Sequence, residues 1–170
     1  RRYRDAARIL RDATSTGVES VALEMRLPEV SYALDQGNFE AALQANRKIL
    51  LASQPVPSLL GRTHRGIEAT LLAYRDGPAA LPVVRAFVRS ERQYALAADA
   101  ADSFHSRFAV LYGAALAARL GDVAIAESTL AAFRGPAVNS GYPAAVEMVA
   151  LVEAELALAG HKPEAALAVL

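Results

Sequence analysis

Three histidines are the residues of this chain that most readily suggest metal or acid–base chemistry. His64, His105 and His161 lie far apart in the sequence, and none belongs to a His-Glu-x-x-His motif or has a histidine four residues away. A helical zinc site needs ligands that share one face of the helix, so this spacing does not build one. The chain has no cysteine, so thiolate ligands are absent too. We expect no metal site, and we interpret the histidines as solvated or partly buried.

Nucleophilic and nucleotide chemistry find equally little support. The sequence has no Gly-x-Ser-x-Gly motif for an activated serine, and the absence of cysteine removes the thiol alternative. It has neither a Walker-type loop nor a Gly-x-Gly-x-x-Gly fingerprint to hold a phosphate. We therefore expect a protein that is not an enzyme and that needs no cofactor.

The composition indicates a helical domain with no net charge and therefore no overall electrostatic field. Hydrophobic residues make up 54% of the 170 residues. They are dominated by alanine and leucine, which helices tolerate best, so an all-α fold is predicted. Eighteen basic and eighteen acidic side chains cancel, which disfavours generic nucleic-acid or membrane binding. The sequence shows no signal peptide and no long uncharged apolar run. A cytoplasmic location is the default expectation. We interpret the sequence as a piece of a longer chain.

Recurring glycines predict four helix hairpins. Gly37, Gly77, Gly121 and Gly160 are spaced by 40, 44 and 39 residues, and each separates two helix-like stretches. Glycine suits a helix C-terminus because it adopts the left-handed conformation without a Cβ penalty. Residues suited to begin the next helix follow each glycine, as N-caps or in its first turn: Asn38, Pro78, Asp122 and Pro163. Alanine stands five residues after three of the glycines (Ala42, Ala126 and Ala165), where two helices are expected to cross closely, whereas the second unit has Pro82.

Apolar spacing of three and four residues supports helices on both sides of each glycine. The predicted hairpins cover approximately residues 20–54, 58–98, 103–134 and 142–170, in a single helical-repeat domain over 1–170. Breaks are expected at 54–58, 99–103 and 135–143, the last being the longest loop. We expect the first leading helix to start near Pro28, and residues 1–16 to form a helix that completes an earlier hairpin.

The segment Gly37-Asn38-Phe39-Glu40-Ala41-Ala42-Leu43 resembles the turn and second-helix start of tetratricopeptide (TPR) repeats. The family repeat is about 34 residues, and the longer units here are more similar to the lengthened hairpins of large bacterial regulators, such as the maltose-type transcription activators. The resemblance implies a right-handed α-solenoid of about four stacked hairpins. It also implies that the leading helices line a concave surface for extended peptides.

Carrying the family's groove positions over by their distance from each glycine gives a mixed set of candidate binding residues. The candidates taken from these positions include His64, Glu68, Arg75, Phe108, Tyr112, Arg119, Glu147 and Leu151. Phe108 and Tyr112 also fit a core interpretation. Separately, Arg85, Arg89 and Arg92 share one helical face and form the candidate electrostatic patch, with a solvated face as the alternative.

Three functions remain open from the sequence. The first is a protein-interaction or scaffold module that binds a peptide or helix of unknown identity on its concave face, or that regulates a neighbouring effector domain. The second is a small-molecule sensor domain of a bacterial transcription regulator or signalling protein, which a closed, aromatic-lined pocket near Phe108 and Tyr112 would favour. The third is self-association into a homo-oligomer through exposed apolar faces of the last hairpin.

Overall fold

The described part of the chain is entirely helical. The computed structural model describes residues 26–52, 59–97, 103–140 and 142–169, together with residues 5, 8, 9 and 12. Among these residues no strand occurs, which confirms the all-α prediction. They fall into two compact units, residues 1–71 and 72–170. The predicted helix over 1–16 lies mostly outside the described residues, as do the predicted breaks at 54–58 and 99–103.

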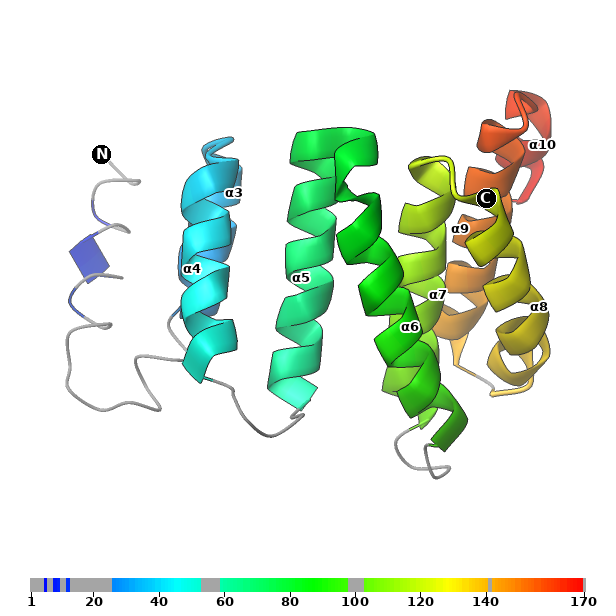
Figure 1. Ribbon diagram of the computed structural model, residues 1–170, viewed down its shortest axis with the longest axis horizontal. Helices are drawn as coiled ribbons and strands as arrows, with labels where there is room; N and C mark the ends of the chain where they lie inside the picture. Colours follow the sequence, from blue (N-terminus) through cyan, green and yellow to red (C-terminus); the bar gives the residue numbers. More distant parts are fainter. Residues whose placement is uncertain are drawn as a thin grey trace. The chain divides into compact units, whose positions relative to one another are not determined.

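Unit 1 contains α3 (Arg26–Asp35), α4 (Phe39–Ala52) and most of α5 (Leu59–Asp76) (Figure 1). α3 and α4 contact each other as a hairpin, and their buried side chains include Val30, Leu43 and Ile49. α3 begins at Arg26, slightly earlier than expected. Pro28 therefore falls in the first turn, where its missing N–H costs no hydrogen bond.

Unit 2 begins with the end of α5 and continues through the 3-10 turn η1 (Gly77–Ala80) and α6 (Leu81–Ala97). It then contains α7 (Ser103–Arg119), α8 (Val123–Val138), α9 (Pro143–Ala159) and α10 (Pro163–Val169) (Figure 1). α7 is the central helix of this unit because it contacts α6, α8 and α9. Its buried residues are mostly small, which allows neighbouring helices to approach closely; they include Ala114, Ala115, Ala117 and Ala118.

Three of the predicted turn glycines adopt the left-handed conformation. The backbone φ is 67° at Gly37, 57° at Gly77 and 91° at Gly121. The turns at Gly37 and Gly121 are followed by the expected N-caps. The Asn38 side chain accepts a hydrogen bond from the N–H of Ala41 at 3.0 Å, and the Asp122 side chain accepts one from Ile125 at 3.3 Å.

The fourth turn is shifted by one residue from its prediction. Gly160 has a φ of −85°, and the left-handed residue is His161, with a φ of 56°. The hydrogen-bond pattern follows His161: the N–H of the next residue, Lys162, donates to Ala157 at 2.9 Å, as Asp122 donates to Ala117 at 2.8 Å. The small residue that is buried five positions after the left-handed residue is consequently Ala166. The expectation that Ala165 takes this place was wrong, because Ala165 is exposed.

The predicted break at 135–143 is shorter than expected. α8 continues to Val138 with Pro136 inside it, so the loop before α9 begins only at Asn139. Proline removes one helical N–H donor, yet the helix persists beyond it, and Ala137 on its last turn is completely buried. Burial of this turn offsets the local effect of Pro136.

Gly113 lies at a close approach of α6 and α7. A Cβ atom at this position would lie 2.8 Å from a side-chain carbon of Val88 and 3.1 Å from the ring of Phe87. Val88 and Phe87 are themselves buried, so they have little room to move. The contact between the two helices therefore depends on the missing side chain of Gly113.

We predict that His161→Gly stabilises the protein. A left-handed conformation costs an L-residue about 1–2 kcal/mol, and glycine avoids this cost while losing more backbone entropy on folding. The net gain in the free energy of unfolding should be about 0.5–1 kcal/mol, measured by urea denaturation. The matched variant Gly160→Ala should change stability little, because Gly160 has a negative φ. Destabilisation by His161→Gly would contradict the assignment of the turn.

We also predict that Gly113→Ala lowers the free energy of unfolding by about 1–3 kcal/mol, because the new methyl group overpacks the contact between α6 and α7. Gly135→Ala is the control. Gly135 lies in α8, and apart from its two chain neighbours and the nearby backbone of its own helix, no described atom lies within 4 Å of the place that an alanine methyl group would take. Alanine raises the helix propensity at this position, but its Cβ crowds the ring of the following Pro136. The two effects oppose each other, so the free energy of unfolding should change by less than about 1 kcal/mol. Equal effects of the two substitutions in thermal unfolding would argue against a close helix crossing.

Candidate functional site

Arg119, one of the predicted binding residues, joins side chains from three leading helices, the first helices of successive hairpins. It lies at the end of α7, and its Nε donates to Glu155 Oε1 on α9 at 3.0 Å. Its Nη2 donates to the same carboxylate oxygen, and its Nη1 donates to the hydroxyl of Tyr74 at the end of α5. The guanidinium carbon also lies 5.2 Å from the centre of the Tyr74 ring, a cation–π distance. We call Tyr74, Arg119 and Glu155 the Arg119 cluster.

The members of the Arg119 cluster differ in exposure. The Glu155 side chain is only 7% exposed, whereas that of Arg119 is 41% exposed. The Tyr74 residue is 58% exposed. The hydrogen bonds to Glu155 are the largest influence on the guanidinium, and they raise the pKa of Arg119 above its ordinary value. The cluster is therefore a fixed, electrically paired group with an accessible aromatic ring at one edge.

An open hollow lies beside the Arg119 cluster. Its volume is about 470 Å³, and its lining comes from the end of α7, the start of α8 and the end of α9. Arg119 and Glu155 form its polar side, and Ala118, Val123 and Leu158 form its apolar side. This arrangement can hold an apolar group next to hydrogen-bond donors.

His64 does not contribute to this surface. It is 1% exposed, and it pairs with Asn46 across the contact between α4 and α5. The Asn46 amide donates to the His64 carbonyl oxygen at 2.9 Å, and its oxygen lies 2.6 Å from His64 Nδ1. Because that oxygen can only accept, Nδ1 carries the proton of the neutral ring. Burial lowers the pKa of His64 below 6.5, so this histidine belongs to the core of unit 1.

Two further predicted residues are engaged in ion pairs away from the hollow. Glu68 accepts from Arg47 Nε at 3.1 Å between α5 and α4. Arg75 binds its neighbour Asp76 through two hydrogen bonds, at 2.6 and 2.8 Å. These bonds lower the pKa of the exposed Asp76 carboxyl group.

The remaining predicted groove residues lie on α7 and α9. Phe108, Tyr112 and Leu151 are half-buried, whereas Glu147 is exposed. Neither Phe108 nor Tyr112 lines the hollow beside Arg119. The structure thus brings Arg119 together with two residues that were not in the predicted set, and it does not gather the predicted set into one pocket.

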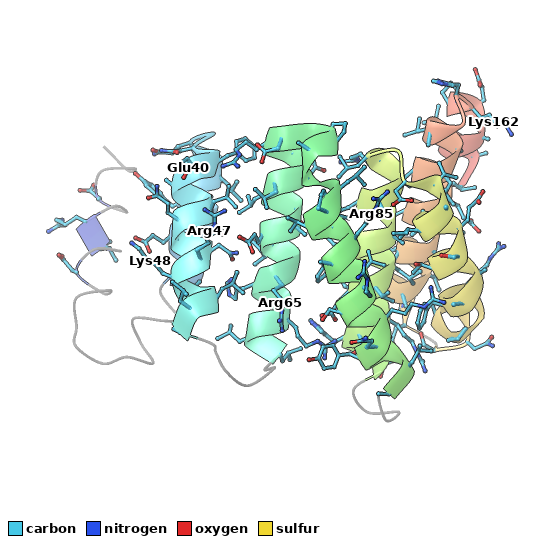
Figure 2. All side chains as sticks on the ribbon, in the orientation of Figure 1. Glu40, Arg47, Lys48, Arg65, Arg85 and Lys162 are labelled. Atoms are coloured by element: carbon cyan, nitrogen blue, oxygen red, sulfur yellow. The ribbon has the colours of Figure 1, made fainter. Side chains whose placement is uncertain are left out.

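The predicted arginine patch is only partly available. Arg85, which is labelled on α6 in Figure 2, donates through its Nε to Asp122 Oδ2 at 2.6 Å. This ion pair compensates the charge of Arg85. Among the described residues, Arg89 and Arg92 have no ion-pair partner, and Arg92 is half-buried. Arg89 is thus the member of this patch that is both exposed and uncompensated.

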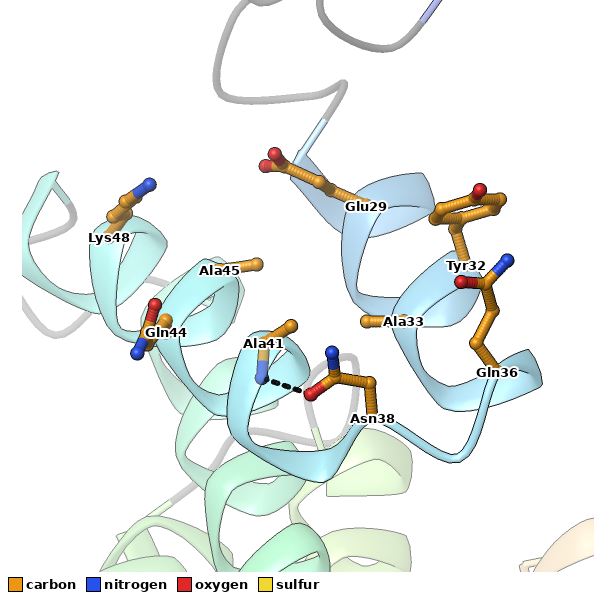
Figure 3. Close-up of a pocket in the computed structure, with 9 residues that line it drawn as sticks. All are labelled: Glu29, Tyr32, Ala33, Gln36, Asn38, Ala41, Gln44, Ala45 and Lys48. Atoms are coloured by element: carbon orange, nitrogen blue, oxygen red, sulfur yellow. Dashed lines mark hydrogen bonds between the residues drawn. The ribbon is translucent and has the colours of Figure 1, made fainter. Parts of the chain in front are cut away.

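A second hollow, of about 270 Å³, lies between α3 and α4 of unit 1 (Figure 3). Ala33, Ala41 and Ala45 form its floor, and polar side chains that include Gln36, Gln44 and Lys48 surround them. None of the predicted binding residues lines it. The two alanines at positions 41 and 45, one helical turn apart, are the feature of the sequence that could have indicated a shallow floor here.

Sequence reasoning missed Tyr74, Glu155 and Asn46 as partners. Tyr74 and Arg119 occupy nearly the same position before their turns, three and two residues from Gly77 and Gly121, and this could have suggested their contact. Glu155 and Asn46 gave no such signal, because their importance comes from contacts with residues 36 and 18 positions away.

Within the described ranges there is no group of three or more side chains suited to hold a metal ion. No helix in the same part of the chain is both long and apolar enough to cross a membrane. Comparisons with family models, with curated proteins and with solved structures found no match. The function is therefore argued from the geometry of the Arg119 cluster and its hollow.

The buried His64 predicts a specific pH dependence of stability. Its pKa is lower in the folded state than the ordinary value of 6.5, so the unfolded chain binds the proton more readily. The free energy of unfolding should fall as the pH decreases from about 7 through 6.5 towards 5, by at most about 1.4 kcal/mol per pH unit. Urea denaturation across this range measures the slope. In His64→Gln the slope should largely disappear, and an unchanged slope would contradict the assignment.

Proposed function

We propose that this chain is a non-catalytic protein-interaction module of the TPR-like type, a right-handed α-solenoid of stacked hairpins. In this proposal the leading helices of unit 2 bind an extended peptide of a protein partner. Binding there would scaffold the partner or regulate a neighbouring effector domain. The turn-closed hairpins and the resemblance around Gly37 support the architecture, and the Arg119 cluster supports the place of binding.

The observation that carries the proposal is the position of the Arg119 cluster. It joins the ends of α5, α7 and α9, and an accessible tyrosine and an open hollow lie next to it. Tyrosine and arginine are the residues that most often anchor protein interfaces, since they combine apolar area with polar groups of fixed geometry. Arg119 is held rigidly by Glu155, so little conformational entropy is lost when a partner contacts it.

The small-molecule sensor is the alternative function. It would require a pocket that surrounds most of its ligand, because such sites bury about 70–90% of a ligand's surface. The hollow beside Arg119 is open and is not lined by Phe108 or Tyr112. An open hollow flanked by exposed side chains suits a peptide that continues along the helices better than an isolated small molecule.

The proposal predicts that the chain selects peptides through Arg119. A random peptide library displayed on phage should yield peptides that bind the immobilised chain, and fluorescence polarisation with the synthetic peptides then gives the dissociation constant. Arg119→Lys should weaken binding about tenfold, because lysine keeps the charge but loses the planar fork that contacts Tyr74 and Glu155 together.

Arg134→Lys is the matched control. Arg134 on α8 also pairs with a glutamate of α9, Glu153, at 2.9 Å, but its side chain is 63% exposed and does not line the hollow. This variant should bind the selected peptides like the wild type. A library that yields no binding peptide would contradict the proposed function, and equal binding by the two arginine variants would contradict its location.

A further inference from the structure

The hollow beside Arg119 opens at a position where other hairpins carry a large side chain. Three residues before the left-handed turn residue stand Leu34, Tyr74, Ala118 and Leu158 in the four hairpins. The three large members are 37%, 58% and 49% exposed. In the third hairpin alanine takes this place and is 1% exposed. The third hairpin therefore has no large side chain at this place, and its alanine is covered by neighbouring residues.

Because position 118 carries no large side chain, an apolar space remains there, and its lining residues can be named. Ala118 and Val123 line it from the α7–α8 hairpin, and Leu158 lines it from α9. The exposed Leu158 therefore has apolar neighbours on the side of the hollow and an uncovered surface beyond it. Burial of a partner's aliphatic side chain between these residues would remove apolar area from water on both sides.

The polar edge of the hollow determines which groups of the partner can lie beside the partner's aliphatic side chain. The charge of Arg119 is compensated by Glu155, so this edge attracts neither an anion nor a cation strongly. Arg119 uses three of its N–H groups in the bonds to Glu155 and Tyr74, and a guanidinium has five. The two remaining N–H groups can donate to a neutral acceptor, such as a peptide carbonyl oxygen.

We propose that the hollow is a specificity pocket for one uncharged aliphatic side chain, leucine, isoleucine or methionine, of an extended peptide partner. The neighbouring peptide carbonyl accepts a hydrogen bond from Arg119, and the chain continues over the exposed ring of Tyr74. This inference rests on the proposed function and adds the chemistry of the partner. It makes Ala118 the residue that determines specificity, through the absence of a larger side chain.

The test fills the hollow from the protein side. Ala118→Leu introduces the residue that the first and fourth hairpins have at this position. Because Ala118 is 1% exposed, the neighbouring side chains must make room for the leucine, so the folding of this variant is checked before binding is measured. Val123→Phe fills the same space from α8 and serves as a second variant if the first unfolds, which thermal melting by circular dichroism detects. Ala131→Leu, at an exposed position of α8 that does not line the hollow, is the control.

The selected peptides should share one aliphatic position. Replacing it by alanine should weaken binding by the wild type about tenfold or more, as expected for loss of one buried side chain. Ala118→Leu or Val123→Phe should weaken binding of the unmodified peptide by a similar factor, and the alanine peptide should then lose little more. Ala131→Leu should bind like the wild type.

Three results would overturn the inference. Selected peptides could depend on Arg119 yet share no aliphatic position, which would leave the proposed function in place without this pocket. Folded Ala118→Leu and Val123→Phe proteins could bind the peptides with unchanged affinity. This result would also leave the proposed function in place and remove the pocket. N-acetyl-leucine amide could bind as tightly as the full peptides, which would show a small-ligand site in place of a peptide surface. If no peptide is selected, the proposed function fails and the inference fails with it.

Discussion

The left-handed residue that closes each hairpin is the constraint on which the rest of the structure depends. It ends the leading helix at one defined residue, at positions 37, 77, 121 and 161. Residues at the same distance from this point therefore hold equivalent places in different hairpins. In three hairpins the residue five positions later is a buried alanine, namely Ala42, Ala126 and Ala166, whereas Pro82 at this place in the second hairpin is exposed. The hollow of unit 2 is a consequence of the same register, since it lies where one equivalent position has a small residue.

The sequence predicted the turns well because their chemistry is local. A glycine followed by Asn38 or Asp122 specifies both a helix end and the next N-cap, and both were found. The fourth turn was misplaced because Gly160 precedes His161, and local preference favours glycine for the left-handed place. The packing of α10 on α9, with Ala166 inwards, is a tertiary preference that the sequence pattern did not reveal. α8 likewise continues through Pro136 because tertiary packing buries its last turn, which the sequence pattern did not reveal.

The candidate site was less predictable because distances along the chain do not specify contacts between helices. Offsets from the turns selected Arg119, which lies beside a surface hollow in the structure. The same offsets selected His64, whose ring is buried because Asn46 on a neighbouring helix satisfies both its Nδ1–H and its backbone carbonyl. Glu155 was missed because a buried carboxylate is recognisable only through its partner. Arg119 pairs a buried charge and also borders the hollow, so in the proposed function one residue of unit 2 serves both stability and recognition.

The central claim is that a peptide occupies the surface between α7 and α9 beside Arg119. The most direct measurement is a methyl NMR titration of the chain, labelled at alanine, leucine and valine methyl groups, with a selected peptide. The account predicts that the methyl signals of Ala118, Val123 and Leu158 shift together and saturate with the same dissociation constant. The methyl signals of Leu96, which is 71% exposed on α6, should remain unchanged. Shifts confined to Leu96 or to residues of α3 and α4, with Ala118 and Leu158 unaffected, would contradict it.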